Sequence, residues 1–226
     1  MPIVLALSVA PWEQELLHAI NCGLSGPLAD AVFLTLQRAV VGIVVMLIAL
    51  GLVWDKDRKT GLRALATTLI GYGLCMLIAD VAWGVHLRVR PGRAAEVVLK
   101  TPREIATCAQ HPEAVVVRKH VSRRSGMPSR HSLSAGVFAA TMVLASRWLG
   151  VLACLYAILV GMARIYSGVH WPSDVFVGVS VGAMVATLVW GAVPWIFGKL
   201  GRRHWVEDPA MKTETTSEAR PGDTPG

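Results

Sequence analysis

Long apolar runs recur along this chain, and they restrict it to folds that place helices in a bilayer. Charged loops, glycines and a tight polar turn separate the runs. Hydrophobic residues make up 54% of the sequence, and the mean hydropathy is +0.51. We therefore predict an all-α, polytopic helical membrane bundle with spans at residues 39–54, 64–85, 133–145, 149–162 and 175–197.

The two ends of the chain differ from these apolar runs. Residues 11–24 alternate polar and apolar side chains, which is typical of an amphipathic helix on the bilayer surface. The last residues are rich in Thr, Glu, Pro and Gly, a composition that favours disorder. We predict a membrane-embedded domain over residues 1–203 and a disordered tail over residues 204–226.

Three polar residues in or beside the helical segments have local roles to fill. Asp30 is suited to cap a helix that leads into the first span, and Gln37 marks the interface or a bend at the start of that span. Asp80 lies inside the second span, where a carboxylate is a functional candidate. We expect it to pair with a nearby arginine.

The net charge of +7 raises the question of an anionic partner. No zinc-finger spacing, basic helix or aromatic-studded sheet pattern accompanies the charge, so a nucleic-acid partner is not expected. The basic residues lie at the ends of apolar runs, where anionic lipid headgroups explain them better. The expected partners are the bilayer and a lipid, and the sequence leaves the oligomeric state open.

A polar stretch between the last two runs carries chemically useful residues. Arg164 ends one run, and His170 and Asp174 follow four residues apart. On a helix this spacing places the carboxylate beside the imidazole. Such a partner fixes the tautomer of the ring, which suits a nucleophile or a base. The alternative is a polar hairpin turn that carries these residues by chance.

Two earlier stretches bring similar residues to the ends of other runs. Pro128 and Ser129 are helix-start residues, and free backbone N–H groups there suit an anion. His131 lies in the first turn of that helix. Residues 86–91 close the second span, and Pro91 is predicted to stop its helix.

Together these stretches resemble the type 2 phosphatidic acid phosphatase and vanadium haloperoxidase superfamily, in its membrane lipid phosphatase branch. The superfamily pattern is Lys-x6-Arg-Pro, then Pro-Ser-Gly-His, then Ser-Arg-x5-His-x3-Asp. The matching residues, in the same order, are Arg90-Pro91, then Pro128, Ser129 and His131, then Arg164, His170 and Asp174. Three positions depart from the pattern, because Trp83 replaces Lys, Arg130 replaces Gly and Ala163 replaces Ser.

The resemblance implies an integral membrane phosphatase that hydrolyses a lipid phosphomonoester or pyrophosphate without a cofactor or metal. His170 would attack phosphorus and form a phosphohistidine, with Asp174 holding its other ring nitrogen. His131 would protonate the leaving oxygen and later activate water. The residues implied or suggested for phosphate binding are Arg90, Arg164, Ser129, Arg130 and Arg88.

The departures keep other functions open. The same residues would serve a lipid phosphotransferase, and the loss of the lysine at Trp83 allows a catalytically inactive, lipid-binding relative. We expect Arg130 to compensate for that lysine, the alternative being that it faces water or lipid headgroups. A non-catalytic protein that binds anionic lipid is less well supported, because lipid binding does not require histidines.

Basic loops predict the orientation in the membrane. Lys and Arg gather in residues 56–63, at Arg147 and in residues 199–203, while the first 30 residues have none. The positive-inside rule places these loops in the cytoplasm and the motifs on the outer face, in a bacterial inner membrane. The basic stretch 86–131 opposes this orientation, and we attribute its charge to the anion site.

Four cysteines show no spacing typical of a metal site. Cys75 and Cys154 lie within predicted spans and are expected to pack there. Cys22 and Cys108 fall on the predicted outer face, where a disulfide is permitted, but nothing in the sequence shows that they meet.

Overall fold

The structure, a computed structural model, describes residues 8–84, 88–111, 113–122 and 125–206. Its elements in chain order are α1 (Pro11–Asn21), α2 (Pro27–Leu36), α3 (Ala39–Lys56), α4 (Arg58–Gly84), α5 (Pro91–Ala94), β1 (Val98–Leu99), α6 (Pro102–Ala106), the 3₁₀ turn η1 (Cys108–Gln110), β2 (Val115–Val116), α7 (Arg130–Ala145), α8 (Arg147–Tyr166) and α9 (Pro172–Val206).

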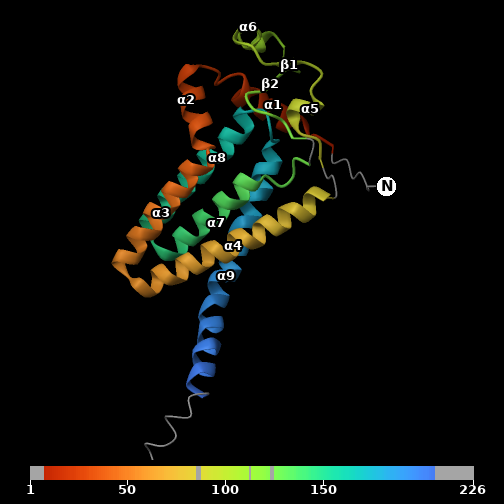
Figure 1. The fold of residues 1–226 in the computed structure, drawn as a ribbon. Helices are drawn as coiled ribbons and strands as arrows, with labels where there is room; N and C mark the ends of the chain where they lie inside the picture. Colours follow the sequence, from red (N-terminus) through yellow and green to blue (C-terminus); the bar gives the residue numbers. More distant parts are fainter. Residues whose placement is uncertain (1–7, 85–87, 112, 123–124, 207–226) are drawn as a thin grey trace, which may run out of the picture.

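Helix α7 forms the centre of the bundle. It lies among α3, α4, α8 and α9 and contacts all four (Figure 1). Leu133 and Met142 on it are fully buried. Small residues allow α7 and α9 to approach closely, since a Cβ at Gly182 of α9 would lie 2.2 Å from the Leu133 carbonyl oxygen. The predicted all-α membrane bundle is therefore confirmed.

The number of spans differs from the prediction. Within the described residues, four helices are long and apolar enough to cross a bilayer, over Ala39–Lys56, Arg58–Gly84, Arg147–Tyr166 and Pro172–Ile196. The predicted span at 133–145 is α7, which has only 16 residues and is enclosed by its neighbours. At 16 residues α7 is shorter than the roughly 20 helical residues that cross a bilayer core, and it lies at the centre of the bundle.

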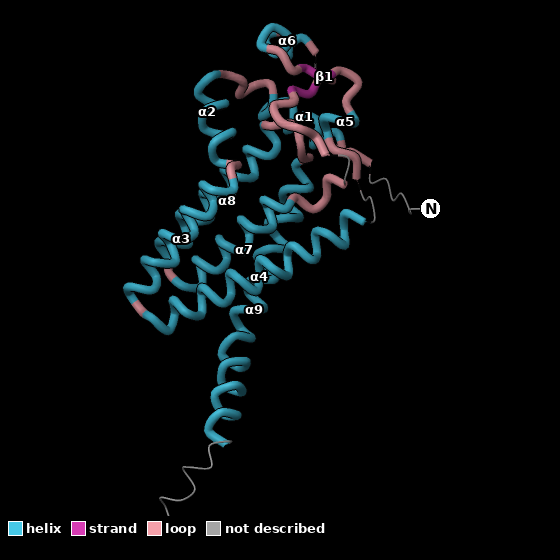
Figure 2. Tube along the Cα trace, viewed as in Figure 1, coloured by secondary structure: helices cyan, strands magenta, loops and turns pink. Residues whose placement is uncertain are grey.

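The motif-bearing ends of the long helices meet at one end of the bundle. Helices α1, α2, α5 and α6 gather there, together with a two-stranded parallel sheet in which Val98 pairs with Val115 (Figure 1). Figure 2 shows that most loops also lie at this end, whereas short turns join the helices at the other. A disulfide between Cys22 and Cys108 ties α1 to this assembly.

Several predicted boundaries are corrected. Helix α2 begins at Pro27 behind Gly26, so Asp30 lies within the helix and does not cap it. Pro91 starts α5 and does not stop α4, which ends at Gly84. Helix α9 continues through Val206, past the predicted start of the tail, and the rest of that tail, residues 207–226, lies outside the described residues.

Candidate active site

A tight turn between α8 and α9 carries His170. Gly168 in this turn has a φ of +70°, a conformation that favours glycine, and a Cβ there would lie 2.5 Å from the Val116 carbonyl oxygen. The Gly168 carbonyl accepts a hydrogen bond of 3.1 Å from the Gly92 amide. The turn is thus held by strand β2 and by the first motif, and only 2% of His170 is exposed.

The start of α9 places Asp174 beside His170. Helix α9 begins at Pro172, so His170 precedes it and the prediction that both residues share one helical face is wrong. The Asp174 carboxylate accepts a hydrogen bond of 2.9 Å from the Trp171 amide, and its Oδ2 lies 3.5 Å from His170 Nδ1. The Asp174 side chain thus reaches back to the residue before the helix, and this contact brings Asp174 and His170 together.

Arg90 binds the other nitrogen of the same ring. Its Nη1 lies 3.0 Å from His170 Nε2 and also donates to the Val169 carbonyl at 3.1 Å. Arginine has only donors, so Nε2 must carry the lone pair and Nδ1 the proton. The ring is thereby presented in the tautomer that a nucleophilic Nε2 requires, with its N–H toward Asp174.

The second histidine lies in the same electrostatic environment. Burial and the charges of Arg164 and Arg90 hold the pKa of His170 well below its ordinary value. Burial, and then the charges of Arg164, His170 and Lys119, lower the pKa of His131 to about 3. Both rings are thus neutral at pH 7 in the free protein, and the surrounding positive potential favours an anion.

Ser129 connects the second and third motifs. It is fully buried and caps α7, with its hydroxyl accepting from the Ser132 amide at 3.5 Å. Its own amide donates to the Asp174 carbonyl at 3.2 Å. The start of α7, with its free backbone N–H groups and His131, is therefore held near His170.

Arg88 does not take the predicted role. It forms a buried, bidentate ion pair with Glu13 of α1, at 3.0 and 2.5 Å, and also contacts Ser173. Its Nη1 lies 3.9 Å from Asp174 Oδ1. Because Glu13 and Ser173 engage both of its Nη atoms, Arg88 supports the Asp174 carboxylate and is not placed to clamp phosphate.

Glu13 was missed in the sequence as a functional residue. Burial alone would raise its pKa, but hydrogen bonds from Arg88, Ser173 and the Ala10 amide outweigh that effect and lower the pKa to about 2. A signal was present, because the first 30 residues contain no Lys or Arg to pair with a carboxylate on the buried face of α1. Its partner had to come from a distant segment.

Arg130 turns away from the histidines. Its guanidinium pairs with Asp80 and lies 4.1 Å from the centre of the Trp83 ring. The expectation that it replaces the missing cation is wrong for this geometry, because its charge is directed to a carboxylate on α4. The Trp83 ring also lies beside Arg90, whose guanidinium carbon is 5.7 Å from the ring centre. The predicted pairing of Asp80 with an arginine is confirmed.

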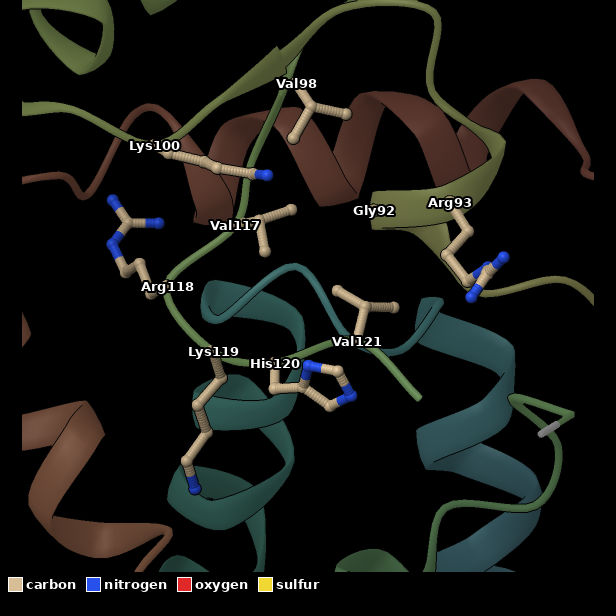
Figure 3. A pocket seen from close by; sticks show the side chains of 9 residues that line it. All are labelled: Gly92, Arg93, Val98, Lys100, Val117, Arg118, Lys119, His120 and Val121. Atoms are coloured by element: carbon tan, nitrogen blue, oxygen red, sulfur yellow. The ribbon is translucent and has the colours of Figure 1, made fainter. Parts of the chain in front are cut away.

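A basic groove borders the turn that carries His170. It has a volume of about 570 Å³, and Figure 3 shows its lining residues, which are Gly92, Arg93, Val98, Lys100, Val117, Arg118, Lys119, His120 and Val121. Arg118 forms one wall, where its amide donates to the Ser167 carbonyl at 3.4 Å. Burial and the charges of Arg164 and Arg38 lower the pKa of Lys119. The groove thus extends the positive potential toward water.

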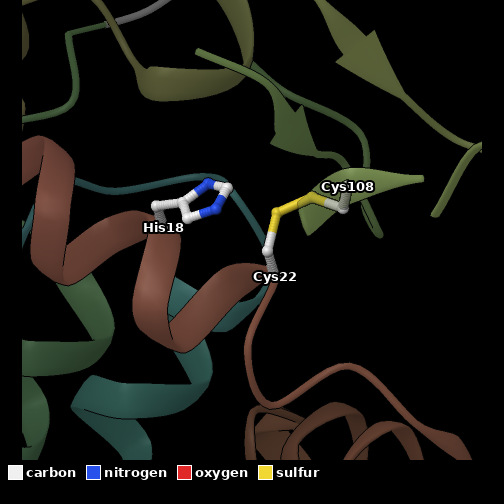
Figure 4. A group of neighbouring side chains, drawn as sticks. All are labelled: His18, Cys22 and Cys108. Carbon is white, nitrogen blue, oxygen red and sulfur yellow. A yellow bond between two sulfur atoms is a disulfide. The ribbon is translucent and has the colours of Figure 1, made fainter. Parts of the chain in front are cut away.

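One group of potential metal ligands occurs in the described part of the chain. It consists of His18, Cys22 and Cys108, whose side chains lie together in Figure 4. The two sulfur atoms are joined in a disulfide, so His18 alone retains a ligand atom there. This group therefore does not supply a metal to the histidine site, and the predicted independence of metal stays a prediction.

The fold and the site define a class of protein, a helical membrane bundle with two histidines and two arginines gathered at one end. Residues 96–197 match the PAP2 superfamily, which confirms the resemblance that the motifs indicated. The first motif, at Arg90, precedes the matched region.

Named relatives share part of the sequence. An undecaprenyl-diphosphatase of Sulfolobus acidocaldarius is 28% identical over 141 residues, which cover 62% of this chain and 58% of that protein. Human sphingosine-1-phosphate phosphatase 2 is 33% identical over 114 residues, covering 47% of this chain and 27% of that protein. The chain therefore matches less than two thirds of the length of either relative.

Solved structures share the fold. The crystal structure of Aquifex aeolicus LpxE aligns with a TM-score of 0.62 at 20% identity, over 81% of this chain and 98% of that one. A transmembrane PAP2-type phosphatidylglycerolphosphate phosphatase from Bacillus subtilis aligns with a TM-score of 0.55 at 23% identity, over 83% and 89%. At these identities the likeness shows the fold alone.

Proposed function

We propose that this integral membrane protein is a lipid phosphate phosphatase that works through a phosphohistidine at His170. One observation carries the proposal: His170 is buried with Nδ1 toward Asp174 and Nε2 beside Arg90, in a site shared with Arg164 and His131. A structural histidine needs no such convergence of cations. A nucleophile that attacks a phosphoryl dianion does, because the cations bind and neutralise its oxygens.

The reaction follows from the placement of the two rings. The Nε2 lone pair attacks phosphorus while the bond to the leaving lipid oxygen breaks, and Asp174 stabilises the charge that develops on His170. His131 donates a proton to the leaving oxygen. The bound dianion offsets the cations that lower the pKa of His131, so the ring can carry that proton in the complex. Water then attacks phosphorus, His131 accepts its proton, and inorganic phosphate leaves as the P–N bond breaks.

The phosphoryl group needs positive charge, which the chain supplies through arginines. Arg90 and Arg164 are both buried at the site, and the backbone N–H groups at the start of α7 add neutral donors. We therefore propose turnover without a metal. The test is phosphate release in the presence of EDTA. We expect activity to be retained, whereas an enzyme that depends on a metal would lose it.

The names of the relatives suggest the substrate class. Lipid diphosphates and phosphomonoesters, including a polyprenyl diphosphate and a sphingoid phosphate, are the first substrates to test because the relatives' names specify them.

The site lies at the end of the bundle opposite the junction of α3 and α4 (Figure 1), where the basic residues Lys56 and Arg58 lie. With that junction in the cytoplasm, the site opens on the outer face of a bacterial inner membrane.

Trapping the intermediate tests the proposal. Brief exposure to ³²P-labelled lipid phosphate, followed by denaturation, is expected to leave acid-labile, base-stable label on the wild type and none on His170→Ala. His111→Ala, which changes a half-exposed histidine away from the site, is the matched control and retains label. Label on His170→Ala would overturn the assignment. Transfer of label to a second lipid would identify a phosphotransferase, and lipid binding without any label would identify an inactive relative.

A further inference from the structure

A buried glutamine outside all three motifs touches the site from a separate segment. Gln37 follows the last residue of α2, at the junction with α3, and only 1% of it is exposed. Its side-chain oxygen accepts a hydrogen bond of 2.8 Å from Arg164 Nη1 and lies 3.3 Å from the Ser167 hydroxyl. Its main-chain carbonyl faces the His131 ring. One residue thus contacts groups on both sides of the site.

The contact with Arg164 fixes how the amide is turned. A guanidinium has donors only, so the oxygen of the Gln37 amide must face Arg164 and the nitrogen must face the other way. That nitrogen, Nε2, is buried and has no hydrogen-bond partner among the described residues. The Nε atom of Arg164 is in the same condition.

Unpaired buried donors call for an acceptor. A donor that is buried without a partner loses its hydrogen bonds to water and gains none in return, so native proteins keep few such groups without a reason. The charged residues around Gln37 include Arg164, the adjacent Arg38 and, farther out, Arg90 and Lys119, none of which accepts a hydrogen bond. The acceptor for these donors must therefore come from a ligand. Because the surrounding charges are positive, that ligand must carry negatively charged oxygens.

We propose that Gln37 is a phosphoryl-binding residue whose Nε2 donates to a non-bridging oxygen of the substrate while its Oε1 holds Arg164. This inference rests on the proposed function and names a further contact of the same site. It also accounts for Trp83, the position where the superfamily lysine is missing. An amide supplies hydrogen-bond donors to the phosphoryl group without adding a third charge beside Arg90 and Arg164.

Two substitutions separate the two roles of the side chain. Gln37→Glu keeps an acceptor for Arg164 but replaces the donor by a negative oxygen that repels phosphate. Gln37→Met removes both groups at nearly constant volume. We expect Gln37→Glu to be at least as thermally stable as the wild type, because it forms a buried ion pair with Arg164, yet to lose about a hundredfold in kcat/KM. A glutamine with only a structural role would show stability and activity moving together.

Phosphate binding supplies a readout that does not depend on turnover. Calorimetry measures the binding of inorganic phosphate to the His170→Ala variant and to the same variant with either Gln37→Glu or Gln37→Met added. We expect both additional changes to weaken phosphate binding at least tenfold. Gln110→Met, which changes an exposed glutamine, is the matched control and binds as the parent does.

The outcomes distinguish this inference from the proposed function. Unchanged phosphate affinity and kcat/KM in folded Gln37→Glu would overturn the role of Gln37 while leaving the phosphatase intact. Phosphate binding that depends on Gln37, in a wild type that forms no phosphohistidine, would overturn the proposed function and support the anion contact. If Gln37→Met does not fold, Gln37→Glu alone still decides, because it retains the contact with Arg164.

Discussion

The ion pair between Glu13 and Arg88 offers the sharpest test of how the site is supported. Only 4% of either side chain is exposed, and Arg88 lies 3.9 Å from Asp174, which in turn lies 3.5 Å from His170. Removing one partner of a buried pair costs about 3–5 kcal/mol, because the other charge is left uncompensated. In Glu13→Gln, the amide oxygen still accepts one bond and Asp174 remains near, so we expect the low end, about 3 kcal/mol.

The same change is expected to lower the rate. Without the Glu13 carboxylate, Arg88 has Asp174 as its nearest negative charge and draws it away from His170. The nucleophile then loses the partner that holds its tautomer, so kcat falls about tenfold or more while KM for the lipid changes little. The effect passes through Asp174, which makes Glu13 a positioning residue.

Matched variants separate this explanation from a loss of packing. Thermal unfolding in detergent and kcat on a lipid phosphate are measured for Glu13→Gln, for Glu15→Gln on the exposed face of the same helix, and for Glu13→Gln combined with Arg88→Met. The control should match the wild type. The double variant should regain stability, since no buried charge remains unpaired. Wild-type kcat and stability in Glu13→Gln would refute the reasoning.

Three further results are expected. His170 stays neutral in the folded protein, whereas a histidine in the unfolded chain takes up a proton near pH 6.5. Lowering the pH from 7 to about 5 should therefore destabilise the wild type relative to His170→Asn by about 2 kcal/mol. Thermal unfolding of both proteins at the two pH values measures this difference. Arg130→Gly should keep kcat/KM within about threefold because Arg130 faces α4, and a hundredfold loss would restore its predicted phosphate contact. In a background without free native thiols, Glu96→Cys should react with an impermeant maleimide in intact cells and Lys59→Cys should not, whereas the reverse pattern would place the site in the cytoplasm.

The sequence alone determined the membrane bundle and the chemical core of the site. Long apolar runs predict membrane helices because backbone groups in lipid must bond within their own segment. Arg164, His170 and Asp174 lie within a dozen residues of one another, so their pattern can be recognised in the sequence without knowledge of the fold. The approximate bounds of the long helices follow for the same reason, since their hydrophobic pattern is local.

Contacts between distant segments were decided by the tertiary structure alone. Glu13 pairs with Arg88 across 75 residues, Gln37 with Arg164 across 127, and Cys22 bonds to Cys108 across 86. A pattern in one segment does not encode which other segment will pack against it. The direction of Arg130 is of the same kind, because a long side chain at a helix start turns toward whichever partner the bundle provides, here Asp80. The burial of α7 likewise depends on the helices around it, not on its own composition.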